Sequence, residues 1–453
     1  TYKKLNGNYL EKVSSFIQII KSKYFLNTNV FGNDLRIILL FIMLLFLVSI
    51  ISSFAYPTDS DSMTYHLSLP KAFAEKGHIF ATPLYKDWMS PFSVEMIHMY
   101  LLVLFDDFTP ILFNCLVQIF FSFSLYILVV TRFSNFAGIL SVLFFYSTPN
   151  MIILLSTGKP DGIFFGIIFL SFHFLLLWKE KNNLNYLYLS SIFVGASLAL
   201  KYQAIYWFFT IYPIFIIIML LNKNVKNFFI LALYFGIIPI IISCPWYLKN
   251  FITTGDPVWP FGYSLFESSF WNAELDTKYK SWETGPGKSL LKYLFGFWNL
   301  TLRQAEWKWG LLIPFLPYNL ILLPGLALTY KRFNKKQIEI IIFCLLAFFI
   351  FYSIWFIGWQ QIRYLLPVMG LLNLISAAVL VHLYQSKNIR ILLRMTFASI
   401  LIFSLSYSIF YNSQFLKNAL GLESKKDFLT NKISFYEDIS FLNENLNDDA
   451  VVL

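Results

Sequence analysis

Charged residues are scarce in this chain, and their scarcity decides the class of protein. Only 13% of the 453 residues are Asp, Glu, Lys or Arg, whereas 57% are hydrophobic. A soluble domain carries about 25% charged residues, so a soluble globular fold is excluded. The mean hydropathy of +0.62 instead indicates a polytopic membrane protein.

Cysteine is equally rare, and no cleavable leader pattern is visible. Cys115, Cys244 and Cys344 lie in or beside apolar segments without paired spacing, which argues against a disulfide framework or a zinc knuckle. The polar and basic stretch 1–36 is too long for the n-region of a signal peptide, and the apolar run after it is long enough to span a membrane. We therefore interpret 1–36 as a cytoplasmic N-terminal segment.

The net charge of +10 does not indicate nucleic acid as a partner. Lys and Arg fall in short clusters between apolar segments, which is the orientation signal of membrane proteins rather than a binding face. We place the clusters at 1–36, 179–181, 223–226, 331–336 and 387–394 on the inner side of the membrane.

Twelve apolar segments are candidates for membrane helices, each of which needs about 20 apolar residues to cross. All of these basic clusters fall on the inner side of the membrane only if one apolar segment between residues 56 and 156 does not cross it. Segment 93–105 is the shortest and contains His98, so we interpret it as a re-entrant or packed helix. The sequence thus predicts an all-α domain, 37–410, of about eleven transmembrane helices. The segments are 37–55, 93–105, 109–131, 136–156, 162–178, 185–200, 203–221, 227–245, 310–329, 337–357, 365–384 and 392–410.

This topology places four loops on the outer side, namely 56–92, 156–161, 245–309 and 358–364, together with the tail 411–453. The outer loops are long, aromatic and hold most of the unusual polar residues, so we expect any chemistry at the outer face. The tail ends on a short apolar run that resembles the first strand of a further soluble domain, and we expect the chain to be a fragment.

Two carboxylates, Asp59 and Asp61, stand directly outside the first apolar run. Ionisable groups at a membrane boundary usually mark a functional site. One interpretation is a carboxylate that takes a proton from a hydroxyl acceptor, and the other is a cap for the following helix. Residues 65–76 have the pattern of an amphipathic helix that lies along the interface, and Gly77 is placed to end it.

The loop 156–161 holds a second acid, Asp161, directly after Pro160. An acidic residue at the start of a helix complements the helix dipole, which is one explanation of its position. The other is a second acid that faces the first loop and binds a metal ion or positions a hydroxyl, with Lys159 as a nearby positive charge. Lys201, at another outer boundary, either contacts an anionic head group or extends to the interface as long basic side chains often do.

Arg363 lies on the side where the inner-loop bias does not explain it. A guanidinium binds phosphate oxygens with two parallel hydrogen bonds, which a lysine does less specifically. The alternative is an interfacial anchor beside Trp359 and Tyr364. The loop 245–309 opens with turn residues and aromatic residues that are able to enclose a hydrophobic or sugar ligand.

In this order, the motifs resemble those of the GT-C glycosyltransferases, and most closely the bacterial membrane enzymes related to protein O-mannosyltransferases and aminoarabinose transferases. The similarity runs from about Leu39 to Tyr384. It rests on Asp61-Ser-Met-Thr-Tyr65-His66, Ser90-Pro91, Lys159-Pro160-Asp161, the opening from Trp246 to Pro260, and Arg363-Tyr364-Leu365-Leu366-Pro367.

The resemblance implies a GT-C fold, catalysis at the outer face of the inner (plasma) membrane and inversion at the anomeric carbon. It implies a polyprenyl-phosphate-linked sugar as donor, a glycan, lipid or protein hydroxyl as acceptor, and contact with membrane lipid. Carried over, Asp61 and Asp161 match the two loop acids, and Arg363 matches the phosphate-binding residue.

Further residues complete the predicted site. Lys159 and Lys201 are expected to add positive charge for the donor phosphate, while Asp59, Tyr65 and His66 support the acids. A divalent cation held by Asp61 and Asp161 stays an alternative. The chain departs from many relatives, which show an Asp-Glu pair where it has Ser-Asp61-Ser; it also has Ser90-Pro91 where some carry Lys-Pro-Pro.

A transporter or flippase of lipid-linked or small polar substrates is the alternative function. It requires charges in the middle of membrane helices and discontinuous helices at repeat-related positions. The centres of these segments contain few charges, and no internal repeat is visible. These features favour the enzyme.

Overall fold

The computed structural model describes residues 32–80, 86–221, 227–266, 268, 270–281, 287–302 and 318–446, and within these ranges the chain is helical without a strand. This confirms the predicted all-α class. The helices are α2 (Gly32–Ser52), α3 (Ser68–Lys76), α4 (Ser93–Leu104), α5 (Thr109–Val130), α6 (Asn135–Tyr146), α7 (Pro149–Leu154), α8 (Asp161–Lys181), α9 (Leu184–Leu198), α10 (Ala204–Leu221), α11 (Phe228–Thr254), α12 (Tyr263–Phe266), α13 (Ala273–Ser281), α14 (Leu290–Leu302), α15 (Tyr318–Leu322), α16 (Leu326–Thr329), α17 (Lys335–Ile357), α18 (Leu366–Leu383), α19 (Lys387–Ala419), α20 (Lys425–Lys432) and α21 (Tyr436–Asn445).

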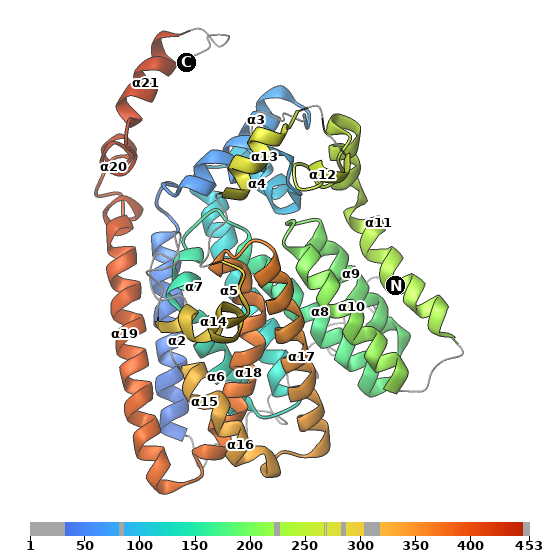
Figure 1. Ribbon diagram of the computed structural model, residues 1–453. Helices are drawn as coiled ribbons and strands as arrows, with labels where there is room; N and C mark the ends of the chain where they lie inside the picture. Colours follow the sequence, from blue (N-terminus) through green and yellow to red (C-terminus); the bar gives the residue numbers. More distant parts are fainter. Residues whose placement is uncertain are drawn as a thin grey trace, which may run out of the picture.

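Two helices that are apolar on all sides form the centre of the bundle. The most apolar windows of α8 and of the α18 segment are 83% and 89% buried, whereas those of α11 and α19 are 22% and 17% buried. Figure 1 shows α19 beside α2 at one edge of the bundle, and α11 at the opposite edge. Because apolar side chains on α11 and α19 are uncovered by protein, these helices present their surfaces to lipid.

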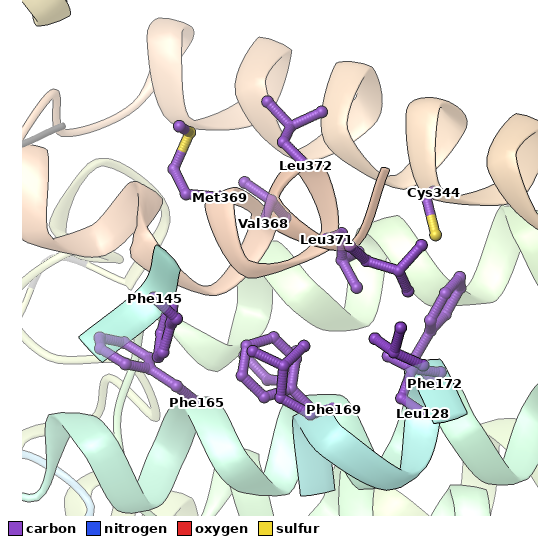
Figure 2. Packing of buried hydrophobic residues seen from close by; sticks show 14 of the residues in the cluster. Leu128, Phe145, Phe165, Phe169, Phe172, Cys344, Val368, Met369, Leu371 and Leu372 are labelled. Atoms are coloured by element: carbon purple, nitrogen blue, oxygen red, sulfur yellow. The ribbon is translucent and has the colours of Figure 1, made fainter. Parts of the chain in front are cut away.

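Aromatic rings fill the space between α6, α8 and α18. The ring of Phe145 lies 6.0 Å from that of Phe165 and 5.4 Å from that of Phe169, with both pairs edge to face. Figure 2 shows these rings below Val368 and Met369 of α18. Edge-to-face pairs add stabilisation to the burial of apolar surface, so this layer fixes the position of α18, which directly follows the turn that carries Arg363.

The number of crossings that the sequence predicts is not confirmed. In the described ranges, eight helices are long and apolar enough to span a membrane, and α4, α6 and α9 are shorter. The 12 residues of α4 extend about 18 Å, less than the hydrocarbon thickness of about 30 Å. This length agrees with a packed segment at 93–105. Of segment 310–329, residues 310–317 lie outside the described residues.

Two segment boundaries predicted from the sequence are wrong, and a proline lies at each of them. Pro149 interrupts one helix, whereas Pro245 does not interrupt the other. Segment 136–156 is divided into α6 and α7, since Thr148 precedes Pro149 and is extended rather than helical. In contrast, α11 continues past Pro245 to Thr254, as prolines in membrane helices often allow. The outer loop predicted from residue 245 therefore begins at Gly255, which is in the left-handed region with φ 78°.

The first outer loop has the predicted amphipathic helix. A short π-helical turn, Ser62–His66, leads into α3, which ends at Gly77 with φ 70°. Leu69 and Phe73 are buried against Phe92. At the other end of the chain, α19 continues beyond the predicted limit of 410 and is followed by α20 and α21, while the predicted strand at 451–453 lies outside the described residues.

Close packing of α5 against α8 generates a prediction about stability. A Cβ atom added at Gly166 would lie 2.3 Å from the Cβ of Phe121, so Gly166→Ala is expected to destabilise the bundle by about 1–3 kcal/mol through overpacking. At Gly236 of α11 the nearest atom lies 3.6 Å away, so Gly236→Ala should be neutral or slightly stabilising. Thermal unfolding in detergent compares the two, and equal midpoints would contradict this packing.

Candidate active site

Residues from distant parts of the sequence line a cavity of about 270 Å³, here called the polar cavity. Three of the four predicted outer loops contribute to its wall, which brings together five of the predicted site residues. The lining residues are Asp61, Tyr65, His66, Asp87, Ser90, Pro91, Phe92, Glu95, Leu200, Lys201, Tyr202, Gln203, Pro260, Phe261, Tyr279, Trp359, Gln361, Arg363 and Tyr364.

An ion pair in the cavity wall joins the first outer loop to the turn Ile362–Leu365, which directly precedes α18. Asp61 Oδ2 lies 2.6 Å from Arg363 Nη1 and 3.5 Å from Lys159 Nζ. Burial alone would raise the pKa of Asp61, but the positive charges of Arg363 and Lys159 outweigh burial and lower it. The carboxyl is therefore ionised at neutral pH.

Asp59 acts as a cap, as one of the two interpretations predicted. Its Oδ1 atom accepts a hydrogen bond from the backbone N–H of Ser62 at 3.1 Å and also lies 3.1 Å from Lys159 Nζ. The Ser62 hydroxyl in turn accepts a hydrogen bond from the backbone N–H of Gly158 at 2.9 Å. These contacts hold the loop 156–161 against the first loop and place Lys159 beside Asp61.

Asp161 lies at the first position of α8 and pairs with Lys201 instead of facing Asp61. Lys201 Nζ is 2.6 Å from Asp161 Oδ2, and both residues are buried. Burial lowers the pKa of Lys201, against the opposing effect of the Asp161 carboxylate. Asp161 does not line the cavity, but its partner Lys201 does. Asp161 therefore contributes to the site by pairing with Lys201.

A metal ion shared by the two acids does not fit this arrangement. Asp61 is paired with Arg363 and Lys159, and Asp161 is paired with Lys201. Within the described residues, no group of three or more His, Cys, Asp or Glu side chains is placed to hold a metal.

Glu95, which the sequence reasoning missed, pairs with the predicted residue His66. His66 Nδ1 lies 2.5 Å from Glu95 Oε1, and both side chains line the polar cavity. Burial and the nearby charge of Lys201 lower the pKa of His66 well below its ordinary range, so the imidazole is neutral at neutral pH. A carboxylate inside the apolar segment 93–105 was the available signal.

The end of α11 and the turn after it position another part of the cavity wall. Asn250 Nδ2 donates to the Met89 carbonyl at 2.7 Å, which fixes the end of the first outer loop. The Asp256 carboxylate accepts from the backbone N–H groups of Val258 and Gly262 at 2.9 Å and 3.0 Å. The resulting tight turn presents Phe261 to the cavity, so part of the predicted aromatic opening is a wall.

A second cavity of about 350 Å³, here called the aromatic cavity, adjoins the first. The two share seven lining residues, and Asp276 and Lys280 of α13 border only the second. Its other neighbours are mostly aromatic or apolar. The shared residues are Tyr202, Gln203, Pro260, Phe261, Tyr279, Trp359 and Tyr364. An elongated ligand with one charged end fits this combination.

Comparisons with known proteins agree on the fold. Residues 90–247 match the family described as dolichyl-phosphate-mannose-protein mannosyltransferase, whereas no curated protein sequence shows significant similarity. ArnT from Cupriavidus metallidurans in the apo state has a TM-score of 0.61 at 11% identity, covering 93% of this chain and 82% of that chain. The same enzyme bound to undecaprenyl phosphate gives 0.58 at 12% identity, covering 91% and 81%. The chain therefore has the GT-C fold.

The buried pair of Lys201 and Asp161 generates a second prediction. Lys201→Met leaves the Asp161 carboxylate buried without its partner, which costs about 3–5 kcal/mol of folding stability. The control is Lys179→Met in the same helix as Asp161, since the Lys179 pair with Glu339 is more exposed and is worth about 1 kcal/mol or less. Unfolding midpoints in detergent distinguish them; equal shifts would show that Asp161 does not depend on Lys201.

Proposed function

We propose that this chain, which its family match and fold indicate to be a GT-C membrane glycosyltransferase, transfers a sugar from a polyprenyl-phosphate-linked donor to a hydroxyl acceptor. The reaction takes place at the outer face of the plasma membrane and inverts the anomeric centre. The acceptor is a hydroxyl of a glycan, a lipid or a protein. The observation that carries the proposal is the ion pair of Asp61 with Arg363 in the wall of the polar cavity.

Arg363 is the proposed ligand of the donor phosphate. Its Nη1 atom binds Asp61, while its buried Nε has no hydrogen-bond partner among the described residues. A guanidinium with an unused N–H suits a phosphate oxygen. Lys201 also lines the cavity, and Lys159 lies behind Asp61. When the bond from the sugar to phosphate breaks, these cations stabilise the charge that develops on the leaving phosphate.

Asp61 is the proposed base. Its side chain is 31% exposed, so an acceptor arriving from outside can reach it, and a carboxylate in hydrogen-bond range takes the hydroxyl proton as the new bond forms. Arg363 suppresses its basicity in the empty site. A bound phosphate offsets the positive charge of Arg363. Donor binding therefore raises the pKa of Asp61 and makes this carboxylate a stronger base.

The aromatic cavity suits the part of the donor next to the phosphate. Ring faces contact either isoprenoid chains or the apolar face of a sugar, and the cavity shares its wall with the phosphate-binding region. ArnT, which has the same fold, was solved with undecaprenyl phosphate, which supports a polyprenyl phosphate as the lipid.

A third prediction tests the base. Asp61→Asn keeps the size of the side chain but cannot accept the proton, so turnover should fall about 10²- to 10⁴-fold while the protein inserts normally. The assay uses membrane vesicles with a polyprenyl-phosphate-linked sugar and measures release of polyprenyl phosphate. Asp107→Asn is the matched control, since Asp107 forms an ion pair with Lys425 away from the cavity and should keep wild-type turnover. Near-normal turnover by Asp61→Asn would contradict the assignment of Asp61 as the base.

A fourth prediction tests the phosphate ligand. Arg363→Ala should weaken binding of the donor more than binding of the acceptor, because the guanidinium contacts phosphate oxygens that only the donor has. Arg363→Lys should recover part of the loss, since it keeps the charge but not the paired donors. The measurement is the Michaelis constant for each substrate. Equal changes in both would point to an interfacial anchor instead.

A further inference from the structure

The pair formed by His66 and Glu95 is buried in the wall of the polar cavity without a complete set of hydrogen bonds. The two residues are 2% and 1% exposed, and one atom of each is used in their mutual contact of 2.5 Å. His66 Nε2 and Glu95 Oε2 have no partner among the described residues. Leaving such an atom unsatisfied destabilises the fold, and folded proteins rarely do so.

The surroundings hold the pair rigidly rather than satisfying it. His98 Nδ1 lies 3.3 Å from the His66 carbonyl, and His98 Nε2 lies 3.0 Å from Asn114 Oδ1. The ring of Tyr65 packs on that of His66 with centroids 4.1 Å apart. His98 and Asn114 are buried but do not line the cavity. His98 and Asn114 therefore support the pair from outside the cavity, while His66 and Glu95 themselves belong to its wall.

The chemistry of these two atoms selects the ligand. Burial raises the pKa of the Glu95 carboxyl to about 8 and lowers that of His66, so the pair has no positive charge with which to bind the phosphate end of the donor. A hydroxyl group both donates and accepts, and two neighbouring hydroxyls satisfy a carboxylate oxygen and a ring nitrogen together. Sugars present hydroxyls in this way, and the cavity volume of about 270 Å³ accommodates one sugar ring.

The depth of the pair identifies which sugar it contacts. The Asp61 side chain is 31% exposed, whereas His66 and Glu95 are almost fully buried. The acceptor arrives from outside and meets Asp61, so the inner wall contacts the group that lies between acceptor and phosphate. That group is the sugar being transferred.

We propose that His66 and Glu95 form a hydroxyl-binding subsite that recognises the transferred sugar of the lipid-linked donor. This inference rests on the proposed function, because it takes the ligand of the cavity to be a sugar joined to a lipid phosphate. A site that is built to bind a substrate hydroxyl discriminates strongly against a ligand without it. The pair is therefore a determinant of sugar specificity and is separate from the groups that bind phosphate.

The test measures binding to the full chain in detergent. The probes are undecaprenyl phosphate alone and the same lipid phosphate joined to glucose, galactose, mannose or N-acetylglucosamine. The quantity of interest is the gain in affinity that the best sugar gives over the bare lipid phosphate. In the wild type we expect a gain of about tenfold or more, as expected for two hydrogen bonds that only the sugar can form. Glu95→Gln and His66→Gln should remove it and leave the affinity for undecaprenyl phosphate unchanged.

His173→Gln is the matched control, since His173 is a buried histidine of α8 that contacts Arg132 and does not line the cavity; it should keep the gain from the sugar. Equal losses for the bare and the sugar-linked lipid in the pair variants, or no gain from any sugar in the wild type, would overturn the subsite. If the wild type fails to bind undecaprenyl phosphate at all, the proposed function fails as well. Unfolding midpoints for all variants separate loss of binding from loss of fold.

Discussion

The ion pair of Asp61 and Arg363 joins two parts of the molecule that have little else in common. Asp61 belongs to a loop that lies over the end of the bundle, while Arg363 precedes α18, the most buried of the long helices. Because the α18 segment is 89% buried, the guanidinium has a defined position, and the loop is held to it by a contact of 2.6 Å. The cavity exists because this contact, with Lys159 behind it, sets the distance between loop and bundle.

Charge balance in this part of the protein explains why its cations remain available. Lys201 and Arg363 line a cavity at the end of an apolar bundle, and an unpaired charge there would be costly. Each is paired with one carboxylate, which makes the empty site stable. A phosphate that enters competes with Asp61 for Arg363, so the same pairing that stabilises the empty site links donor binding to the state of the base.

Much of the fold and part of the site could be predicted from the sequence. Asp61, Lys201 and Arg363 were placed at one face by the distribution of basic residues alone, since loop charge sets orientation. The pairing of Asp161 with Lys201 could not be predicted, because it depends on how α8 packs against α9 and the turn after it. The end of α11 was also predicted wrongly. Proline usually ends a helix in a soluble protein, but membrane helices accommodate it, and α11 continues past Pro245.

Glu95 shows a different limit, because it was visible in the sequence and was not used. It lies in a segment too short to span the membrane, where a carboxylate is expensive unless a partner is present. Its partner, His66, was recognised only as support for Asp61. A buried carboxylate needs both a hydrogen-bond partner and a reason for its remaining oxygen, and the structure supplies only the first. Since both residues line the cavity wall, a substrate hydroxyl that reaches the pair would supply the missing partner.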